Sequence, residues 1–158
     1  MLNFFLLFLL MAGSMDSSIA DINLKSPEDS SLTLVIKQDE INPDRVTCYI
    51  KNISSKPLLI NSKFVVGVDL KFVIIDSNGK SVGLEKLVYP SAPDYQYLSL
   101  LNSDADIVTS FSLSDYYKIK PLEVYSVQAI YEPYNGERDE KVWSGSIKSN
   151  QIKLQAFR

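Results

Sequence analysis

The side chains that could do chemistry in this chain are few, and their types restrict the available reactions. The 158-residue sequence contains no histidine and a single cysteine, Cys48. Ser–His–Asp triads, Cys–His pairs and the common zinc motifs all use imidazole, so the composition excludes them. The six glycines are too scattered to build a P-loop or a GxGxxG turn. The remaining candidates are carboxylates, tyrosine hydroxyls and one thiol.

Two carboxylate pairs could in principle bind a metal ion or act as acid and base. Asp104 and Asp106 flank a predicted turn, and Asp139 and Glu140 lie in a predicted hairpin loop. Such oxygens suit Ca²⁺, and a pair at the right separation could hydrolyse a glycosidic bond. Asp76-Ser77-Asn78-Gly79 resembles the start of a calcium loop, but the later ligands are missing, which favours a turn. We therefore expect no enzymatic activity, cofactor or metal; a carboxylate-based hydrolase is the alternative.

Cys48 lies in an alternating segment, VTCYIKN, at residues 46–52. Val46, Cys48 and Ile50 fall on one face of the predicted strand, and this face should point into the core. Burial in apolar surroundings raises the pKa of a thiol and makes it unreactive. A single cysteine also cannot form an intrachain disulfide. We interpret Cys48 as structural; a reactive or intermolecular thiol is the alternative.

Tyrosines supply the best candidate binding surface. The segment YPSAPDYQY, residues 89–97, combines two stiffening prolines with Tyr89, Tyr95 and Tyr97. Rigid amphipathic side chains of this kind are enriched at protein interfaces. Tyr134 begins a second candidate loop, which extends to Lys141. The sequence thus predicts a protein partner bound through loops, although these tyrosines could instead cover a sheet.

The first twenty residues have the features of a secretory signal peptide. Phe4 to Ala12 is an apolar run too short to span a bilayer, and Ser18-Ile19-Ala20 offers small residues for cleavage before Asp21. Export to the periplasm or the medium follows from this prediction. An uncleaved anchor is the alternative.

The rest of the chain reads as a mobile lead at residues 21–31 and one domain at residues 32–158. No second apolar run is long enough for a membrane span. A net charge of −3 gives no basic footprint for nucleic-acid binding. Asn52-Ile53-Ser54 is a glycosylation sequon, relevant only in a eukaryotic source.

The hydrophobic pattern of the domain has a period of two, which predicts strands. Apolar residues alternate in the segments 32–37, 46–52, 70–75, 95–101, 106–113, 124–132 and 143–147. About seven short strands separated by turns predict an all-β fold, a single Greek-key β-sandwich. Trp143 is expected on the core face of the last of these strands.

Three local signals refine this pattern. Asn78-Gly79 predicts a type I′ hairpin turn, and LSDYYKI, residues 113–119, predicts one short helical turn. Beyond Ser149-Asn150 the apolar phase changes from odd to even positions. A β-bulge or bend is expected there.

The segment PLEVYSVQAIYE resembles the tyrosine corner of immunoglobulin-like domains. The resemblance implies that Tyr125 is the corner tyrosine, whose hydroxyl bonds to the backbone upstream. It also implies that Cys48 and Val127 occupy the positions of the core cysteine pair. The glycine common before the tyrosine is replaced by Glu123.

A longer resemblance covers most of residues 32–155. The order VTCYIKNISSKPLLI, FVIIDSNGKSV, YLSLLNSDADIVTSFSLSDYYKI, VYSVQAIYE and VWSGSIKSNQIKL is similar to immunoglobulin-like domains of secreted bacterial proteins. It resembles the N-terminal accessory domain of deuterolysin-type metallopeptidases and, more loosely, BsuPI-type proteinase-inhibitor domains. The turn at residues 101–104 departs from the usual Pro-Gly turn. Because the zinc-binding catalytic domain is absent, the resemblance implies no peptidase activity.

Together these observations predict an exported, non-catalytic binding or accessory module that recognises a protein partner. A peptidase inhibitor that presents a loop, such as residues 89–97, to a protease cleft is the competing hypothesis.

Overall fold

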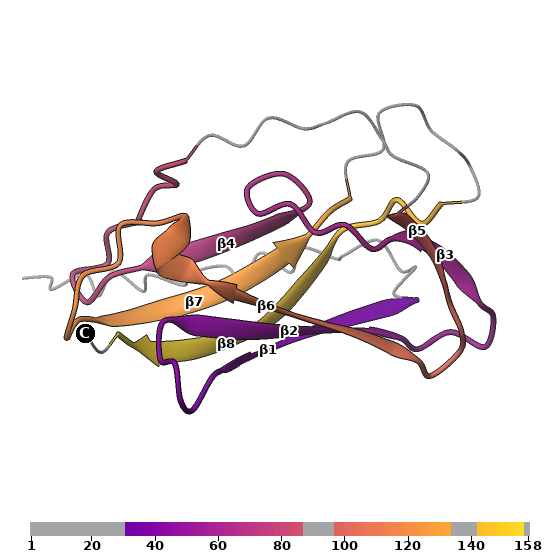
Figure 1. Cartoon of the computed structure of the whole chain (residues 1–158), viewed down its shortest axis with the longest axis horizontal. Coiled ribbons are helices and arrows are strands. Elements are labelled where there is room, and N and C mark those ends of the chain that lie inside the picture. Colours follow the sequence, from indigo (N-terminus) through magenta and orange to yellow (C-terminus); the bar gives the residue numbers. More distant parts are fainter. Residues whose placement is uncertain (1–30, 87–96, 134–141, 157–158) are drawn as a thin grey trace, which may run out of the picture.

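The computed structural model describes residues 31–86, 97–133 and 142–156, and most of their regular structure is β-strand (Figure 1). These residues contain eight strands, which pair antiparallel, and one short 3₁₀ turn at Leu113–Asp115. The predictions of an all-β chain and of a short helical turn are therefore confirmed. Among the described residues, no helix is long and apolar enough to cross a bilayer. The proposed signal peptide and all but the last residue of the N-terminal lead lie outside these ranges.

The strands form three small sheets. One has the order β1–β2–β6, from Leu32–Gln38, Arg45–Asn52 and Asp106–Ser112. Another has the order β4–β7–β8, from Leu70–Ile75, Val124–Tyr131 and Ile147–Gln155. The third pairs β3 with β5, from Leu58–Asn61 and Leu98–Leu101.

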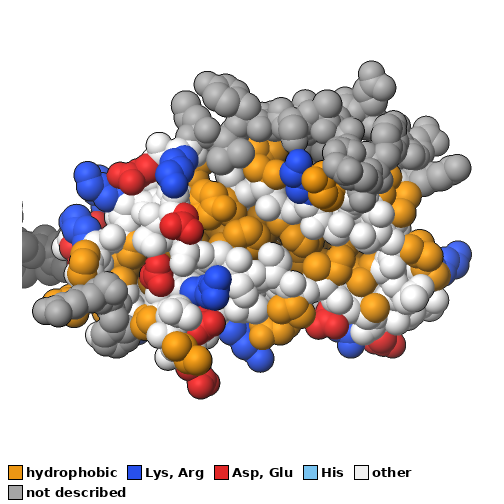
Figure 2. All heavy atoms as spheres, in the orientation of Figure 1, with side chains coloured by type: hydrophobic (Ala, Val, Ile, Leu, Met, Phe, Trp, Pro, Cys, Tyr) orange, Lys and Arg blue, Asp and Glu red, His pale blue; other side chains and the backbone are white. Residues whose placement is uncertain are grey.

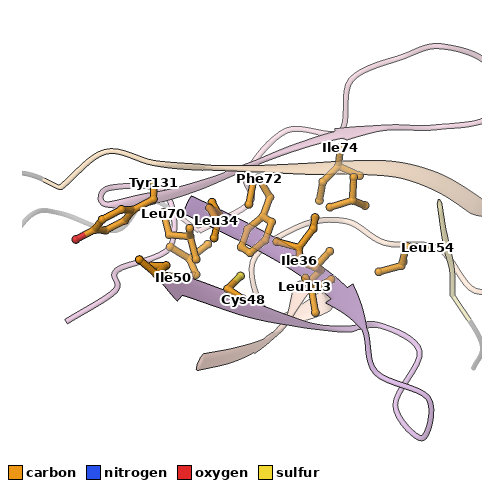
Figure 3. Close-up of a cluster of buried hydrophobic side chains, with 14 of the residues drawn as sticks. Leu34, Ile36, Cys48, Ile50, Leu70, Phe72, Ile74, Leu113, Tyr131 and Leu154 are labelled. Carbon is orange, nitrogen blue, oxygen red and sulfur yellow. The ribbon is translucent and has the colours of Figure 1, made fainter. Parts of the chain in front are cut away.

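The core contains buried apolar side chains from both the β1–β2–β6 and the β4–β7–β8 sheets. Alternation places Val46, Cys48 and Ile50 of β2 inward, and each has an exposed fraction of 0%. In Figure 3, Cys48 and its neighbours on β1 and β2 point toward Phe72 and Ile74 of β4. One continuous cluster of buried side chains therefore joins the two sheets.

A bulge in β8 joins the edges of these two sheets. Gln151 pairs with Gln128, but Lys148 pairs with Ile130, so Ser149 and Asn150 together oppose one residue of β7. The predicted bulge is confirmed at these positions. Asn150 Oδ1 accepts the N–H of Ile36 in β1 at 2.8 Å, and Asn150 Nδ2 donates to the Ile36 carbonyl at 3.1 Å. One amide side chain thus replaces a strand partner for β1.

The outer edge of β4 is covered by neighbouring segments. The hydroxyl of Tyr117, which follows the 3₁₀ turn, accepts the N–H of Phe72 at 3.2 Å. Farther along, the N–H of Val82 donates to the carbonyl of Ile74 at 2.9 Å. A turn forms at Asn78-Gly79 as predicted, but it is not of type I′. Asn78 keeps a negative φ, whereas type I′ needs positive φ at both central residues.

One strand was missed and one predicted strand is wrong. The missed strand is β3, because LLIN has only four residues and no clear alternation. Trp143 does not lie in a strand: β8 begins at Ile147, and only Val142 makes a bridge, in parallel to Leu59. This segment runs beside β3 instead of continuing the ladder of β7.

Candidate functional site

Tyr97 is the one candidate binding tyrosine that the described residues include; Tyr89, Tyr95 and Tyr134 lie outside them. Tyr97 directly precedes β5, and Ser62, the residue after β3, holds its backbone in place. Its carbonyl accepts from the Ser62 N–H at 2.8 Å and from Ser62 Oγ at 2.7 Å. Lys63 Nζ lies 4.6 Å from the centre of the tyrosine ring, a cation–π contact. The backbone of Tyr97 is therefore held by Ser62, and its half-buried ring is contacted on one face by the Lys63 ammonium.

Aromatic side chains form a cluster at the same end of the molecule. Tyr131, at the end of β7, stacks on Trp143 with ring centroids 5.6 Å apart and an interplanar angle of 6°. Phe64 meets the Tyr131 ring edge-on at 5.4 Å. The Tyr131 hydroxyl donates to the Asn61 carbonyl at 3.1 Å, which ties the cluster to β3. Contacts of this kind add to the stabilisation from apolar burial.

Gly145 permits the position of the tryptophan. A Cβ at Gly145 would lie 2.5 Å from Trp143 Cζ2, too close for any side chain without a shift. Trp143 is also held by its backbone, whose N–H donates to the Leu59 carbonyl at 2.8 Å. Trp143 is half-buried and packs against the core from a loop, not from the predicted strand.

A buried carboxylate, that of Asp69, lies near Tyr131. Asp69 is only 3% exposed, and its Oδ2 accepts the Val65 N–H at 3.1 Å. The Val65 carbonyl in turn accepts the Asp69 N–H at 2.9 Å, so the two residues close a tight turn before β4. Burial raises the pKa of the Tyr131 hydroxyl, and the nearby charge of Asp69 raises it further. The arrangement keeps Tyr131 protonated and able to donate.

Lys63, Phe64 and Asp69 were not singled out from the sequence. They lie in a connection of irregular pattern, NSKFVVGVD, between two strands, where neither alternation nor a motif indicates a role. Of the three, Lys63 contacts Tyr97, whereas Phe64 and Asp69 lie near Tyr131.

The Tyr125 hydroxyl forms two hydrogen bonds to the segment just before β7. Its hydroxyl accepts the Lys120 N–H at 2.9 Å and donates to Glu123 Oε2 at 2.9 Å, while the ring is 2% exposed. Burial raises the pKa of Tyr125, and Glu123 adds to the rise. Leu122 has φ 63°, a conformation in which glycine is more common. Tyr125 lies at the opposite end of β7 from Tyr131.

Cys48 has no exposed surface, as the alternation of its strand predicts. Burial raises the pKa of the Cys48 thiol to about 12. At neutral pH the sulfur is therefore a protonated, apolar component of the core.

Asn52, the sequon asparagine, is fully buried, and its amide is occupied. Asn52 Nδ2 donates to the Lys56 and Leu101 carbonyls at 2.8 and 2.9 Å. Its Oδ1 accepts from the backbone and the hydroxyl of Ser54 at 2.9 and 2.7 Å. The side chain joins the end of β2 to the end of β5, so its amide nitrogen is inaccessible in the folded protein.

Of the two candidate carboxylate pairs, only Asp104 and Asp106 lie in the described residues. Asp104 has φ 60° in the turn before β6 and forms an exposed ion pair with Lys51 at 3.2 Å. Asp139 and Glu140 lie outside the described ranges. Within these ranges, no group of three or more Cys, Asp or Glu side chains is placed to hold a metal ion. No protein-family model and no curated protein matches the chain.

Proposed function

We propose that the chain is an exported, non-catalytic binding module that recognises a protein partner with the end of the molecule around β3 and β5. The observation that carries this proposal is the fixed position of Tyr97 between Ser62 and Lys63, next to the cluster of Tyr131 and Trp143. Side chains held in this way lose little conformational freedom on binding, which favours affinity. Aromatic residues of this kind are common at the centres of protein interfaces.

An immunoglobulin-like β-sandwich is the fold that we propose for this module. Two observations support it. The orders β1–β2–β6 and β4–β7–β8 fit two facing sheets with connections of the Greek-key kind. The Tyr125 hydroxyl bonds to the backbone five residues upstream, as in a tyrosine corner. The resemblance to accessory domains of secreted bacterial proteins belongs to the same proposal.

The test compares two tyrosines that occupy matched environments. Tyr97 and Tyr49 are both half-buried, and each has a lysine ammonium over its ring, at 4.6 Å from Lys63 and at 5.2 Å from Lys37. Tyr49 lies on the outer face of β2, away from β3 and β5. The protein and the variants Tyr97→Ala and Tyr49→Ala are each used to capture proteins from the envelope and medium of the source, followed by mass spectrometry.

We expect a stoichiometric partner that Tyr49→Ala retains and Tyr97→Ala loses at least tenfold. If the retained protein is a peptidase whose activity falls, the module is an inhibitor. A partner that both variants retain equally contradicts binding at this end. Circular dichroism of both variants shows whether the fold persists.

A further inference from the structure

No described residue bonds to the outer edge of β6, whereas described residues cover the edges of β1 and β4. Asn150 covers the edge of β1, and Tyr117 and Val82 cover the edge of β4. Within the described part of the chain, β6 pairs only with β2. A strand in this position presents a row of N–H and C=O groups that can pair with another strand.

The hydrogen bonds at the end of β2 identify which groups of β6 face outward. The Asn52 N–H points toward β6, where it bonds to the Ala105 carbonyl, and the next N–H, of Ile53, points to Ser31 on the β1 side. Successive residues alternate in this respect. Cys48 therefore bonds to its partner Thr109, and the backbone groups of Val108 and Ser110 face away from the sheet.

The inward side chains of β6 are also incompletely covered. Ile107, Thr109 and Phe111 are half-buried, whereas their partners on β2 are fully buried. Phe111 contacts Phe72 of β4 across the core, with centroids 6.1 Å apart. Figure 2 shows hydrophobic side chains gathered in the middle of this face, in the region where Figure 1 places β4 above β6. Additional apolar surface beside β6 would complete their burial.

The sequence of β6 does not protect this edge. The segment DIVTSFS contains no lysine, proline or bulge, the usual devices that prevent edge pairing, and its only charge is Asp106 at the first position. Val108, in its middle, is 54% exposed on the outer face.

We propose that two copies of this chain associate through β6, paired antiparallel about a two-fold axis at Thr109. In this register, each Val108 faces the Ser110 of the other copy, and both residues have outward-facing backbone groups. The half-buried Ile107 faces Phe111, so apolar side chains meet on the inner face. Asp106 faces Ser112, which avoids a pair of like charges. The register overlaps all seven residues of β6 and matches the self-complementary geometry of a two-fold interface.

The association is tested first by sedimentation equilibrium of the purified protein over a hundredfold range of concentration. We expect a monomer–dimer equilibrium that Thr109→Asp shifts at least tenfold toward monomer, because two carboxylates would meet on the axis. Thr33→Asp is the matched control: a half-buried threonine on β1 of the same sheet, distant from the edge, whose substitution should leave the equilibrium unchanged. A protein that is monomeric throughout, or a dimer that Thr109→Asp leaves intact, overturns the proposal.

A cross-linking experiment tests the register and does not depend on how Thr109→Asp folds. At the axis, two Thr109→Cys residues would form a non-hydrogen-bonded pair with Cα atoms about 4.5 Å apart, suitable for a disulfide. Two Ser112→Cys residues would lie about 20 Å apart, six residues out of register. Mild oxidation should give a disulfide-linked dimer at least tenfold faster with Thr109→Cys. Equal rates for the two variants would contradict the register, and the native Cys48 is buried in both.

Discussion

The edges of β4 and β6 face the same side of the core, but described residues cover only the edge of β4. At β4, a buried tyrosine hydroxyl and a returning segment accept or donate the outward hydrogen bonds. At β6, no described residue bonds to the outward backbone groups of Val108 and Ser110. Specific side chains bond to the edges of β1 and β4, but none in the described part of the chain bonds to the outer edge of β6. Because described residues cover the edges of β1 and β4 but not that of β6, β6 is an edge at which another strand can pair.

Asn150→Ala should have the largest effect, because it removes the protection of β1. The substitution leaves the Ile36 N–H and C=O without partners in a partly buried position. We expect a loss of about 3 kcal/mol in the free energy of unfolding, measured by urea denaturation. The control is Asn102→Ala in the exposed turn before β6, where the side chain makes no hydrogen bond with described residues and the loss should be within about 0.5 kcal/mol. Equal midpoints for the two variants would show that the bulge does not join the sheets.

Tyr117→Phe tests the cover of β4 with less perturbation. The ring and its contact with Phe72 remain, at a centroid distance of 6.3 Å, but the N–H of Phe72 loses its acceptor. A loss of about 1–2 kcal/mol is expected from one buried, unsatisfied donor. Tyr116→Phe is the neighbouring control, a half-buried tyrosine whose hydroxyl has no described partner. If both variants unfold at the same urea concentration, the hydroxyl of Tyr117 does not protect the edge.

The sequence predicts the centre of each sheet better than its edges. Strict alternation identifies β2 and β7, since their inward side chains are all buried, and the phase change identifies the bulge at Ser149-Asn150. The residues that protect edges follow no period. Tyr117 and Asn150 act on strands that are distant in sequence, and their roles depend on three-dimensional placement.

The candidate site is predicted only in part for the same reason. Tyr97 is singled out by the composition of its segment and Tyr125 by the resemblance to a tyrosine corner, whereas the strand expected at Trp143 does not form. Lys63, Phe64 and Asp69 are missed because the segment that carries them has no regular pattern. β3, which organises them, is too short to give a periodic signal.

A further prediction concerns β2, which is paired on both sides, and the effect of alkaline pH on the free energy of unfolding. Burial raises the pKa of the Cys48 thiol from 9.0 to about 12, so the folded state holds its proton more tightly than the unfolded state. This stabilisation is complete below about pH 9 and is lost as the pH rises toward 12. Cys48→Val should therefore reduce the pH-dependent loss of stability by about 1 kcal/mol between about pH 8 and 10. The test is urea denaturation at both pH values; parallel losses in the two proteins would contradict a buried thiol.

The last prediction concerns β6 itself and needs no substitution, because hydrogen exchange can distinguish its outward amides from its inward ones. In dilute protein, the amides of Val108 and Ser110 should exchange at least a hundredfold faster than those of Ile107 and Thr109, because only the latter pair bonds to β2. Phe72, which Tyr117 covers, should be protected like the inner pair. NMR-detected exchange measures each amide separately, so the alternation within one strand is its own control. Uniform protection of β6 at the lowest concentration would mean that another part of the chain covers the edge. Protection of Val108 and Ser110 that increases with protein concentration would instead follow from pairing between two copies, because only an intermolecular partner obeys mass action.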